Sequence, residues 1–164
     1  MTPRDFRLAD FLPYRLAVLS ERVSRRLSRV YGAEAGLSVA EWRVMVHLSR
    51  CHQVSVREIH TCVNLDKSRV SRAVTRLESA GLLRKTGSVT DQRLLEISLS
   101  DDGWSLLDRI LPPALAYEER LLAALSPEEQ ATLTTIMEKL HQVMDADPDA
   151  RPRSRLDLPR DAAE

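Results

Sequence analysis

The sequence predicts a mainly α-helical protein that carries one small β-hairpin. Hydrophobic residues make up 43% of the 164 residues and aromatic residues only 4%, which disfavours an aromatic-rich β-sandwich. Apolar residues recur at spacings of three and four over most of residues 10–145, as in amphipathic helices. Residues 95–99 instead alternate with period two, as in a half-buried strand.

The first helix is predicted over residues 10–31. Gly32 and Gly36 then end its pattern, because glycine favours the end of a helix. A helix this long must lie against a partner over much of its length to cover its apolar stripe. The stripe consists of Leu12, Leu16, Leu19, Val23, Leu27 and Val30.

Two capping boxes predict the next two helix starts. "SVAE" at 38–41 and "SVRE" at 55–58 both place a glutamate three residues after a serine, so that each side chain can bond the other's backbone amide. Helices should therefore begin near Val39 and Val56. The first is apolar nearly all round and is expected between two layers, and the second should end near Cys62.

Asp66 is a good N-cap for a third helix over 67–80, which Gly81 closes. Three arginines fall within a narrow arc on the flank of this helix opposite its apolar stripe. The apolar stripe is Val70, Ala73, Val74 and Leu77, and the arginines are Arg69, Arg72 and Arg76.

Residues 82–86 and 95–99 read as two strands, and the turn-rich segment 87–93 joins them into a hairpin. Ser100, with two aspartates after it, caps a further helix. Pro112 and Pro113 should kink or break that helix. A last capping box, "SPEE" at 126–129, starts a helix with the stripe Leu133, Ile136, Met137, Leu140, Val143 and Met144.

These elements predict three regions. Residues 38–100 form a winged helix-turn-helix, and residues 10–37 with 101–145 form a helical dimerisation region from both chain ends. The small middle block cannot cover the apolar stripes of the outer helices, so they should pack on each other and on a second copy. Residues 146–164 are rich in proline and charge and are expected to be a disordered tail.

The formal net charge is zero, but it is unevenly distributed. Residues 1–63 and 64–93 each carry a net charge of +4, and residues 94–164 carry −8. A basic first half suggests contact with a polyanion, although scattered surface charge would give the same totals.

The helix over 67–80 is the predicted DNA-reading element. The second helix of a helix-turn-helix enters the major groove, where arginine can pair with guanine or phosphate and short hydroxyl side chains fit beside them. A solvated amphipathic helix is the simpler alternative. The candidate DNA contacts on this helix are Lys67, Ser68, Arg69, Ser71, Arg72, Thr75 and Arg76.

The hairpin supplies a second set of candidate DNA contacts. Asp91 lies two residues from Arg93 and can hold that arginine in one orientation, which suits the narrow minor groove. Arg84 and Lys85 on the first strand are candidates for flanking phosphates. For Arg93, an ordinary turn salt bridge is the alternative.

Residues 66–103, "DKSRVSRAVTRLESAGLLRKTGSVTDQRLLEISLSDDG", resemble the winged helix-turn-helix of the MarR family of bacterial transcriptional regulators. The reading helix, the "ESAGLL" exit and the D-x-R wing pattern followed by "LEISLSDDG" carry this resemblance, and the outer helices extend it to about 10–145. It implies a homodimer that binds a palindromic operator in double-stranded DNA, commonly as a repressor that a small ligand releases.

The resemblance places an effector between the dimer helices and the winged domain. The candidate lining residues are Tyr14, Arg15, Arg22, Trp42 and His47. Arginines beside aromatic rings would suit an aromatic acid or its thioester. The alternative is that Trp42 belongs to the core and the arginines to the surface.

Other classes of function find little support in the sequence. Cys51, His52, His60 and Cys62 fit no zinc spacing, no cofactor motif is present, and no catalytic arrangement suggests an enzyme. The sequence has no signal peptide or membrane-spanning run, so a cytoplasmic protein is expected. The alternative functions are a non-specific architectural DNA binder and a winged-helix protein-interaction module.

Overall fold

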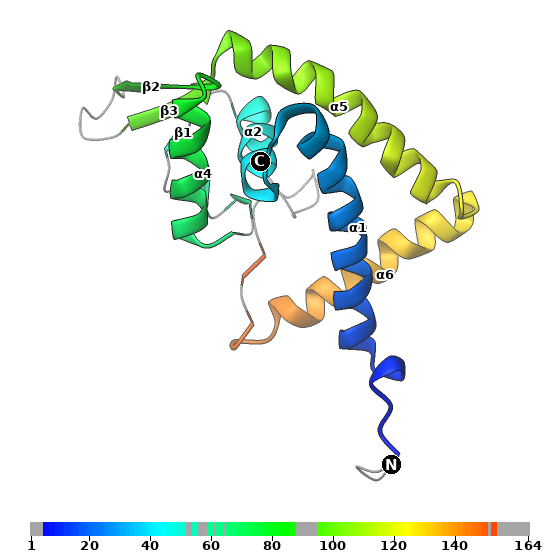
Figure 1. Ribbon diagram of the computed structural model, residues 1–164. Coiled ribbons are helices and arrows are strands. Elements are labelled where there is room, and N and C mark those ends of the chain that lie inside the picture. The colour runs from blue at the N-terminus through cyan, green and yellow to red at the C-terminus, as the bar shows by residue number, and fades with distance from the viewer. Residues whose placement is uncertain are drawn as a thin grey trace.

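The computed structural model describes residues 5–51, 54–55, 59–60, 62–63, 65–87, 95–150 and 152–153 (Figure 1). Its elements are η1 (Leu8–Asp10), α1 (Leu12–Ala35), α2 (Val39–Arg50), β1 (Val54–Ser55), α4 (Lys67–Ser79), β2 (Leu83–Gly87), β3 (Leu95–Leu99), α5 (Asp101–Leu122) and α6 (Pro127–Asp145). The predicted fold class is confirmed: the chain is mainly helical and carries a small antiparallel sheet.

The winged domain is built around α2 and α4. Val44, Met45, Val70 and Leu77 are buried almost completely, and they join one core with Ile97 of the sheet. In Figure 1, α4 and the hairpin lie on one side of this core, whereas α1 and α5 lie on the other. The predicted burial of α2 between two layers is therefore confirmed, because α2 contacts α4 and β3 as well as α1 and α5.

The sheet has one strand more than the sequence predicted. Strand β3 lies in the middle, paired antiparallel with β2 on one side and with β1 on the other. In the hairpin, Leu83 lies opposite Leu99 and Lys85 opposite Ile97. Strand β1 has only two residues, too few to show a period in the sequence.

The predicted helix caps of α2, α4, α5 and α6 are present. Ser38 and Ser126 each form a complete capping box, and the side chains of Asp66 and Ser100 accept backbone amides of their helices. The start expected near Val56 lies outside the described residues, although Ile59, His60 and Cys62 are helical.

Helix α1 runs further than predicted, through Gly32 to Ala35. Gly36 is the residue that ends it, with a φ of +64° that glycine adopts without strain. The amide of Gly36 donates to the carbonyl of Gly32 at 2.9 Å. Of the two glycines predicted to end the pattern, Gly36 is confirmed and Gly32 is wrong. A glycine inside a helix lowers the helix's stability but does not end it when tertiary packing supports both sides.

The prolines do not break α5, which continues through Pro112 and Pro113 to Leu122. Proline removes the hydrogen bond to the carbonyl four residues earlier, here those of Asp108 and Arg109. Both residues are exposed, so water can satisfy these carbonyls. Packing of the opposite face holds the two halves in one helix.

The first residues of the tail that was expected to be disordered make defined contacts. Residues 146–150 form a turn after α6, and the guanidinium of Arg153 contacts Glu138 at 2.9 Å and Asp145 at 2.5 Å. These bonds raise the pKa of Arg153 and lower that of Glu138. Residues 154–164 lie outside the described residues, and their disorder stays a prediction.

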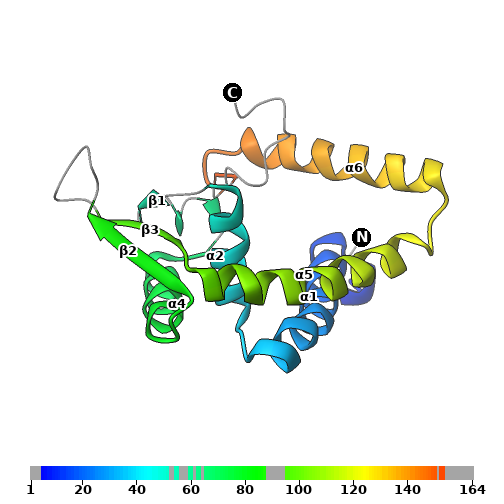
Figure 2. The ribbon, with the colours of Figure 1, turned by 90° about the horizontal axis from the view of Figure 1, so that it is seen from above.

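The outer helices leave much apolar surface uncovered. Helix α6 buries no residue, and Figure 2 shows it standing away from α5 beyond the turn that joins them. Within the described parts of the chain, no helix is long and apolar enough to cross a membrane. The exposed apolar side chains of α6 are Leu133, Ile136, Met137, Leu140, Val143 and Met144.

Gly103 lies in the first turn of α5, against the backbone of Leu82 just before β2. A Cβ atom at this position would lie 2.2 Å from the carbonyl oxygen of Leu82, which itself accepts the amide of Ser100. The backbone cannot move away without losing that bond, so only glycine fits.

We therefore expect Gly103→Ala to lower the free energy of unfolding by about 1–3 kcal/mol, as for other overpacked sites. Denaturant unfolding followed by circular dichroism measures this change. Gly87→Ala is the matched control, since a Cβ at Gly87 would meet nothing within 4 Å. Equal stability of the two variants would contradict the assigned contact.

Candidate nucleic-acid interface

Helix α4 has the two-sided layout that the sequence predicted. Its apolar residues are buried, with Val70 at 0% and Leu77 at 1% exposure. Every candidate DNA contact on α4 is exposed, so all of them share the surface opposite the core. These residues are Lys67, Ser68, Arg69, Ser71, Arg72, Thr75 and Arg76. We call this surface the α4 face.

Asp66 organises the first turn of α4. One of its carboxylate oxygens accepts the hydroxyl of Ser68 at 2.6 Å and the amide of Arg69 at 2.8 Å. The Ser68 bond and then the amide bond lower the pKa of Asp66, which keeps the carboxylate charged at neutral pH. Its other oxygen lies 3.2 Å from Nε of Arg69. Ser68 and Arg69 are therefore held at the end of the helix that enters the groove in this motif.

The three arginines of the α4 face have different partners. Arg69 pairs with Asp66, whereas Nε of Arg72 donates to the carbonyl of Ser68 at 3.3 Å. Arg76 lies 3.1 Å from a carboxylate oxygen of Glu41. Among the described residues, Arg72 is thus the one arginine of this face without a carboxylate partner.

Glu41 has a role that the sequence did not reveal. It is only 4% exposed, and one oxygen accepts the amide of Ser38 at 2.6 Å in the capping box of α2. Its other oxygen contacts Arg76, so one carboxylate connects the start of α2 with the α4 face. The S-x-x-E spacing predicted the cap, but nothing in the sequence indicated the contact with Arg76.

The wing residues that the structure describes are already engaged within the chain. Arg84 lies 2.7 Å from Asp101 at the start of α5, and both side chains are exposed. Lys85 pairs with Glu78 at the end of α4. Exposed pairs of this kind are weak and exchange readily for phosphate. Asp91 and Arg93 lie outside the described residues, so their role stays a prediction.

The predicted effector residues do not form one group. Trp42 stacks on Tyr31, with ring centroids 5.1 Å apart and planes 7° from parallel. It lines an apolar pocket of about 270 Å³ between α1, α2 and α5, which we call the Trp42 pocket. Arg22 lines a cleft of about 440 Å³ between α1 and α5, which we call the arginine cleft.

The two cavities adjoin, because Val23, Tyr117 and Leu121 line both. Tyr14 and Arg15 are exposed near the start of α1 and line neither cavity. His47 is 2% exposed and belongs to the core, so it lines neither cavity. Arg22 and Trp42 thus line adjoining cavities, and the other three predicted residues line neither.

The cysteines and histidines considered as metal ligands differ in their exposure. Cys62 is buried, Cys51 and His60 are half-buried, and His52 lies outside the described residues. Across the described ranges, no group of three His, Cys, Asp or Glu side chains could hold a metal ion.

Comparison with known proteins agrees with this architecture. A family profile described as "MarR family" matches residues 35–94. The regulator PecS of Dickeya dadantii is 26% identical over 130 residues, or 77% of this chain and 78% of its own. The repressor MdtR of Bacillus subtilis is 29% identical over 112 residues, or 68% and 72%.

Solved structures share the fold. A MarR/EmrR family transcriptional regulator from Acinetobacter sp. ADP1 has a TM-score of 0.77 at 26% identity, with 87% of this chain and all of the other covered. A MarR family regulator from Streptomyces coelicolor, solved in complex with DNA, has a TM-score of 0.75 at 24% identity, with 91% and 95% covered.

The Glu41 contact generates a stability prediction. We expect Arg76→Ala to lower the free energy of unfolding by about 1–2 kcal/mol, because it removes the ion-pair partner of a buried carboxylate. Arg72→Ala should leave stability within about 0.5 kcal/mol of the parent, because the bond that Arg72 makes with the described part of the chain is to an exposed backbone carbonyl.

Chemical denaturation of both variants measures this difference. Glu41→Gln keeps a hydrogen-bonding side chain at the cap, so the double variant with Arg76→Ala should lose less than the sum of the single changes. Strict additivity would show that the Glu41–Arg76 contact contributes nothing.

Proposed function

Because the chain belongs to the MarR family of transcriptional regulators, we propose that it is a homodimeric repressor that binds a palindromic operator and leaves it when an effector binds. The exposed, arginine-bearing α4 face is the observation that carries this proposal. Its hydroxyl and guanidinium groups can meet base edges and phosphates, while its apolar face fixes the helix to the core.

The proposal of a dimer rests on uncovered apolar surface. Along α6 the exposed fraction is 49% for Ile136, 53% for Met137 and 66% for Val143. Leu12, Leu16 and other apolar residues near the start of α1 are exposed as well. Water would not stabilise an isolated amphipathic helix of this kind, so a second copy is the partner that α6 requires. A two-fold dimer would present two α4 helices to successive major grooves, roughly 34 Å apart.

The proposal of an effector rests on the Trp42 pocket, which lies between the helices of the proposed dimer region and α2. Its lining from the described residues is mainly apolar and includes one charged residue, Glu118. Of two proteins with the same fold, one is regulated by a small aromatic molecule and the other was solved with one bound. DNA binding by BpsR of Bordetella bronchiseptica is regulated by 6-hydroxynicotinic acid, and the organohalide-sensing regulator RdhR was solved with 2,4-dichlorophenol bound. An aromatic acid or its thioester is the effector that we propose here. Filling this pocket would change how α1 and α5 meet α2, and hence the spacing of the two α4 helices.

Binding to the DNA upstream of its own coding sequence tests the proposed function. We expect fluorescence anisotropy to give affinity at least about 1,000-fold higher for this region than for random DNA, which is the low end for specific regulators. Affinity should fall steeply with salt, because phosphate contacts release counterions. A ratio near one would instead favour a non-specific architectural protein.

Arg72→Ala and Arg93→Ala should each weaken specific binding by about 1–3 kcal/mol. Arg109→Ala is the control, because Arg109 is an exposed arginine on α5 that we assign no role in DNA binding. Parent-like affinity of the Arg72 variant would remove α4 as the reading helix, and parent-like affinity of the Arg93 variant would remove the wing.

The dimer is tested separately. Ile136→Glu together with Leu140→Glu should give a monomer in sedimentation experiments and abolish specific binding, because two carboxylates would enter the apolar interface. Thr135→Glu with Gln142→Glu adds the same charge on the opposite face of α6 and should leave the dimer intact. A dimeric Ile136/Leu140 variant would contradict the assigned interface.

A further inference from the structure

The arginine cleft carries an unusual concentration of positive charge. Arg22, Arg25, Arg26 and Arg29 follow one another at positions i, i+3, i+4 and i+7 of α1, so they lie on one face of the helix. All four are exposed and all four line the cleft. Like charges at this spacing repel one another and lower the stability of α1. An anion bound between the four arginines would relieve this repulsion.

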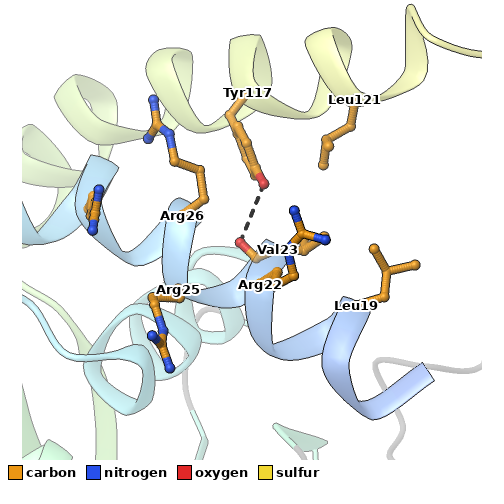
Figure 3. A pocket seen from close by; sticks show the side chains of 8 residues that line it. Leu19, Arg22, Val23, Arg25, Arg26, Tyr117 and Leu121 are labelled. Carbon is orange, nitrogen blue, oxygen red and sulfur yellow. Dashed lines mark hydrogen bonds between the residues drawn. The ribbon is translucent and has the colours of Figure 1, made fainter. Parts of the chain in front are cut away.

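Few carboxylates from the described part of the chain pair with these arginines. Among the described residues, Arg25 alone of the four has an ion pair, with Glu21. Figure 3 shows Arg25 extending away from α5, whereas Arg26 rises beside Tyr117. Three guanidinium groups, those of Arg22, Arg26 and Arg29, therefore line the cleft without a carboxylate partner from the described residues.

Tyr117 fixes the geometry between the two cavities. Tyr117 as a whole is 9% exposed, and its hydroxyl donates to the carbonyl of Val23 at 3.4 Å (Figure 3). The guanidinium of Arg26 lies 5.5 Å from the centroid of the Tyr117 ring. This cation–π contact holds Arg26 over the boundary between the cavities. A molecule that crosses Tyr117 would thus pass from an apolar site to a cationic one.

The lining of the Trp42 pocket disfavours a free carboxylate inside it. Among the described residues, Glu118 is the one charged residue of its lining, and it would repel a carboxylate, while Trp42, Leu111 and Leu115 suit an apolar ring. A simple aromatic acid could place its single charge near Arg26. It would leave the other guanidinium groups of the cleft without an anion.

We propose that the arginine cleft binds the phosphate groups of an effector whose apolar acyl group fills the Trp42 pocket. This inference rests on the proposed effector site and narrows it to a ligand with two or more phosphates, such as an aromatic acyl thioester of a nucleotide-bearing carrier. Arginine suits this task, because its planar fork pairs with phosphate through two parallel hydrogen bonds.

DNA is a less suitable occupant of the cleft. Figures 1 and 2 both place α1 and the facing part of α5 on the side of the molecule away from α4 and the hairpin. The arginine cleft would therefore face away from DNA that lies along the α4 face. A duplex would also be unable to place an apolar group in the Trp42 pocket.

The experiment compares four probes with the full-length protein: benzoate, benzoyl-coenzyme A, coenzyme A and inorganic pyrophosphate. Isothermal titration calorimetry gives each affinity. We expect benzoyl-coenzyme A to bind at least about 100-fold more tightly than benzoate, because two or more charge-assisted pairs contribute about tenfold each. Coenzyme A should bind with intermediate affinity, and pyrophosphate weakly but measurably.

The double variant Arg22→Gln/Arg29→Gln tests the cleft itself. It should weaken benzoyl-coenzyme A binding by about 100-fold and leave benzoate binding unchanged. Arg22→Lys/Arg29→Lys keeps the charge and should retain most of the affinity. Arg109→Gln/Arg120→Gln removes two exposed arginines of α5 that do not line the cleft, and it should bind like the parent.

The outcomes separate this inference from the proposed function. Benzoate binding as tightly as its thioester, or a parent-like Arg22/Arg29 variant, would overturn the phosphate cleft, while specific DNA binding would still support a regulator. Loss of the dimer or of operator binding in that variant, with unchanged ligand binding, would also overturn it. Loss of the dimer would assign the arginines to contact with a second copy, and loss of operator binding would assign them to contact with DNA.

Discussion

The docking of α4 on the core is the contact on which the rest of the arrangement depends. The apolar stripe of α4 consists of Val70, Ala73, Val74 and Leu77, and its burial fixes the rotation of the helix about its own axis. Because these four residues face inward, the arginines and hydroxyl side chains between them must face outward. The same core positions β3 through Ile97 and α5 through Ile110, so the hairpin and the outer helices take their places relative to α4.

Charge then refines what packing begins. Although the chain has no formal net charge, it gathers arginines on two separate surfaces, the α4 face and the arginine cleft, while its second half is acidic. On the α4 face, Asp66 pairs with Arg69 and buried Glu41 pairs with Arg76, whereas the one partner of Arg72 among the described residues is a backbone carbonyl. A guanidinium group that pairs with a buried carboxylate is held in one orientation, but it must weaken that pair in order to bind another group. Arg72 keeps the greatest freedom to pair with a base or a phosphate.

The outer helices link the two surfaces. Helix α5 begins at the hairpin, where Asp101 meets Arg84, and passes the Trp42 pocket before it reaches the arginine cleft at Tyr117 and Leu121. A ligand seated across Tyr117 would therefore act on the same rigid helix that borders the wing. Since α6 follows α5 through a short turn, a shift of α5 would also reach the proposed dimer interface.

The sequence by itself determined the elements and the two-sided character of α4. Caps, apolar periods and a period-two strand are local signals. They predicted where α2 and α6 begin, and they predicted both ends of α4 and β3 to within one residue. Local signals failed where distant parts of the chain decide. Tertiary packing allows α1 to continue past Gly32 and α5 to continue past its two prolines. The two-residue strand β1 forms through its pairing with β3. Only the tertiary structure showed that Glu41 contacts Arg76, that His47 is buried and that Arg26 lies over the ring of Tyr117. Each of these features depends on residues from different elements, which no sequence period relates.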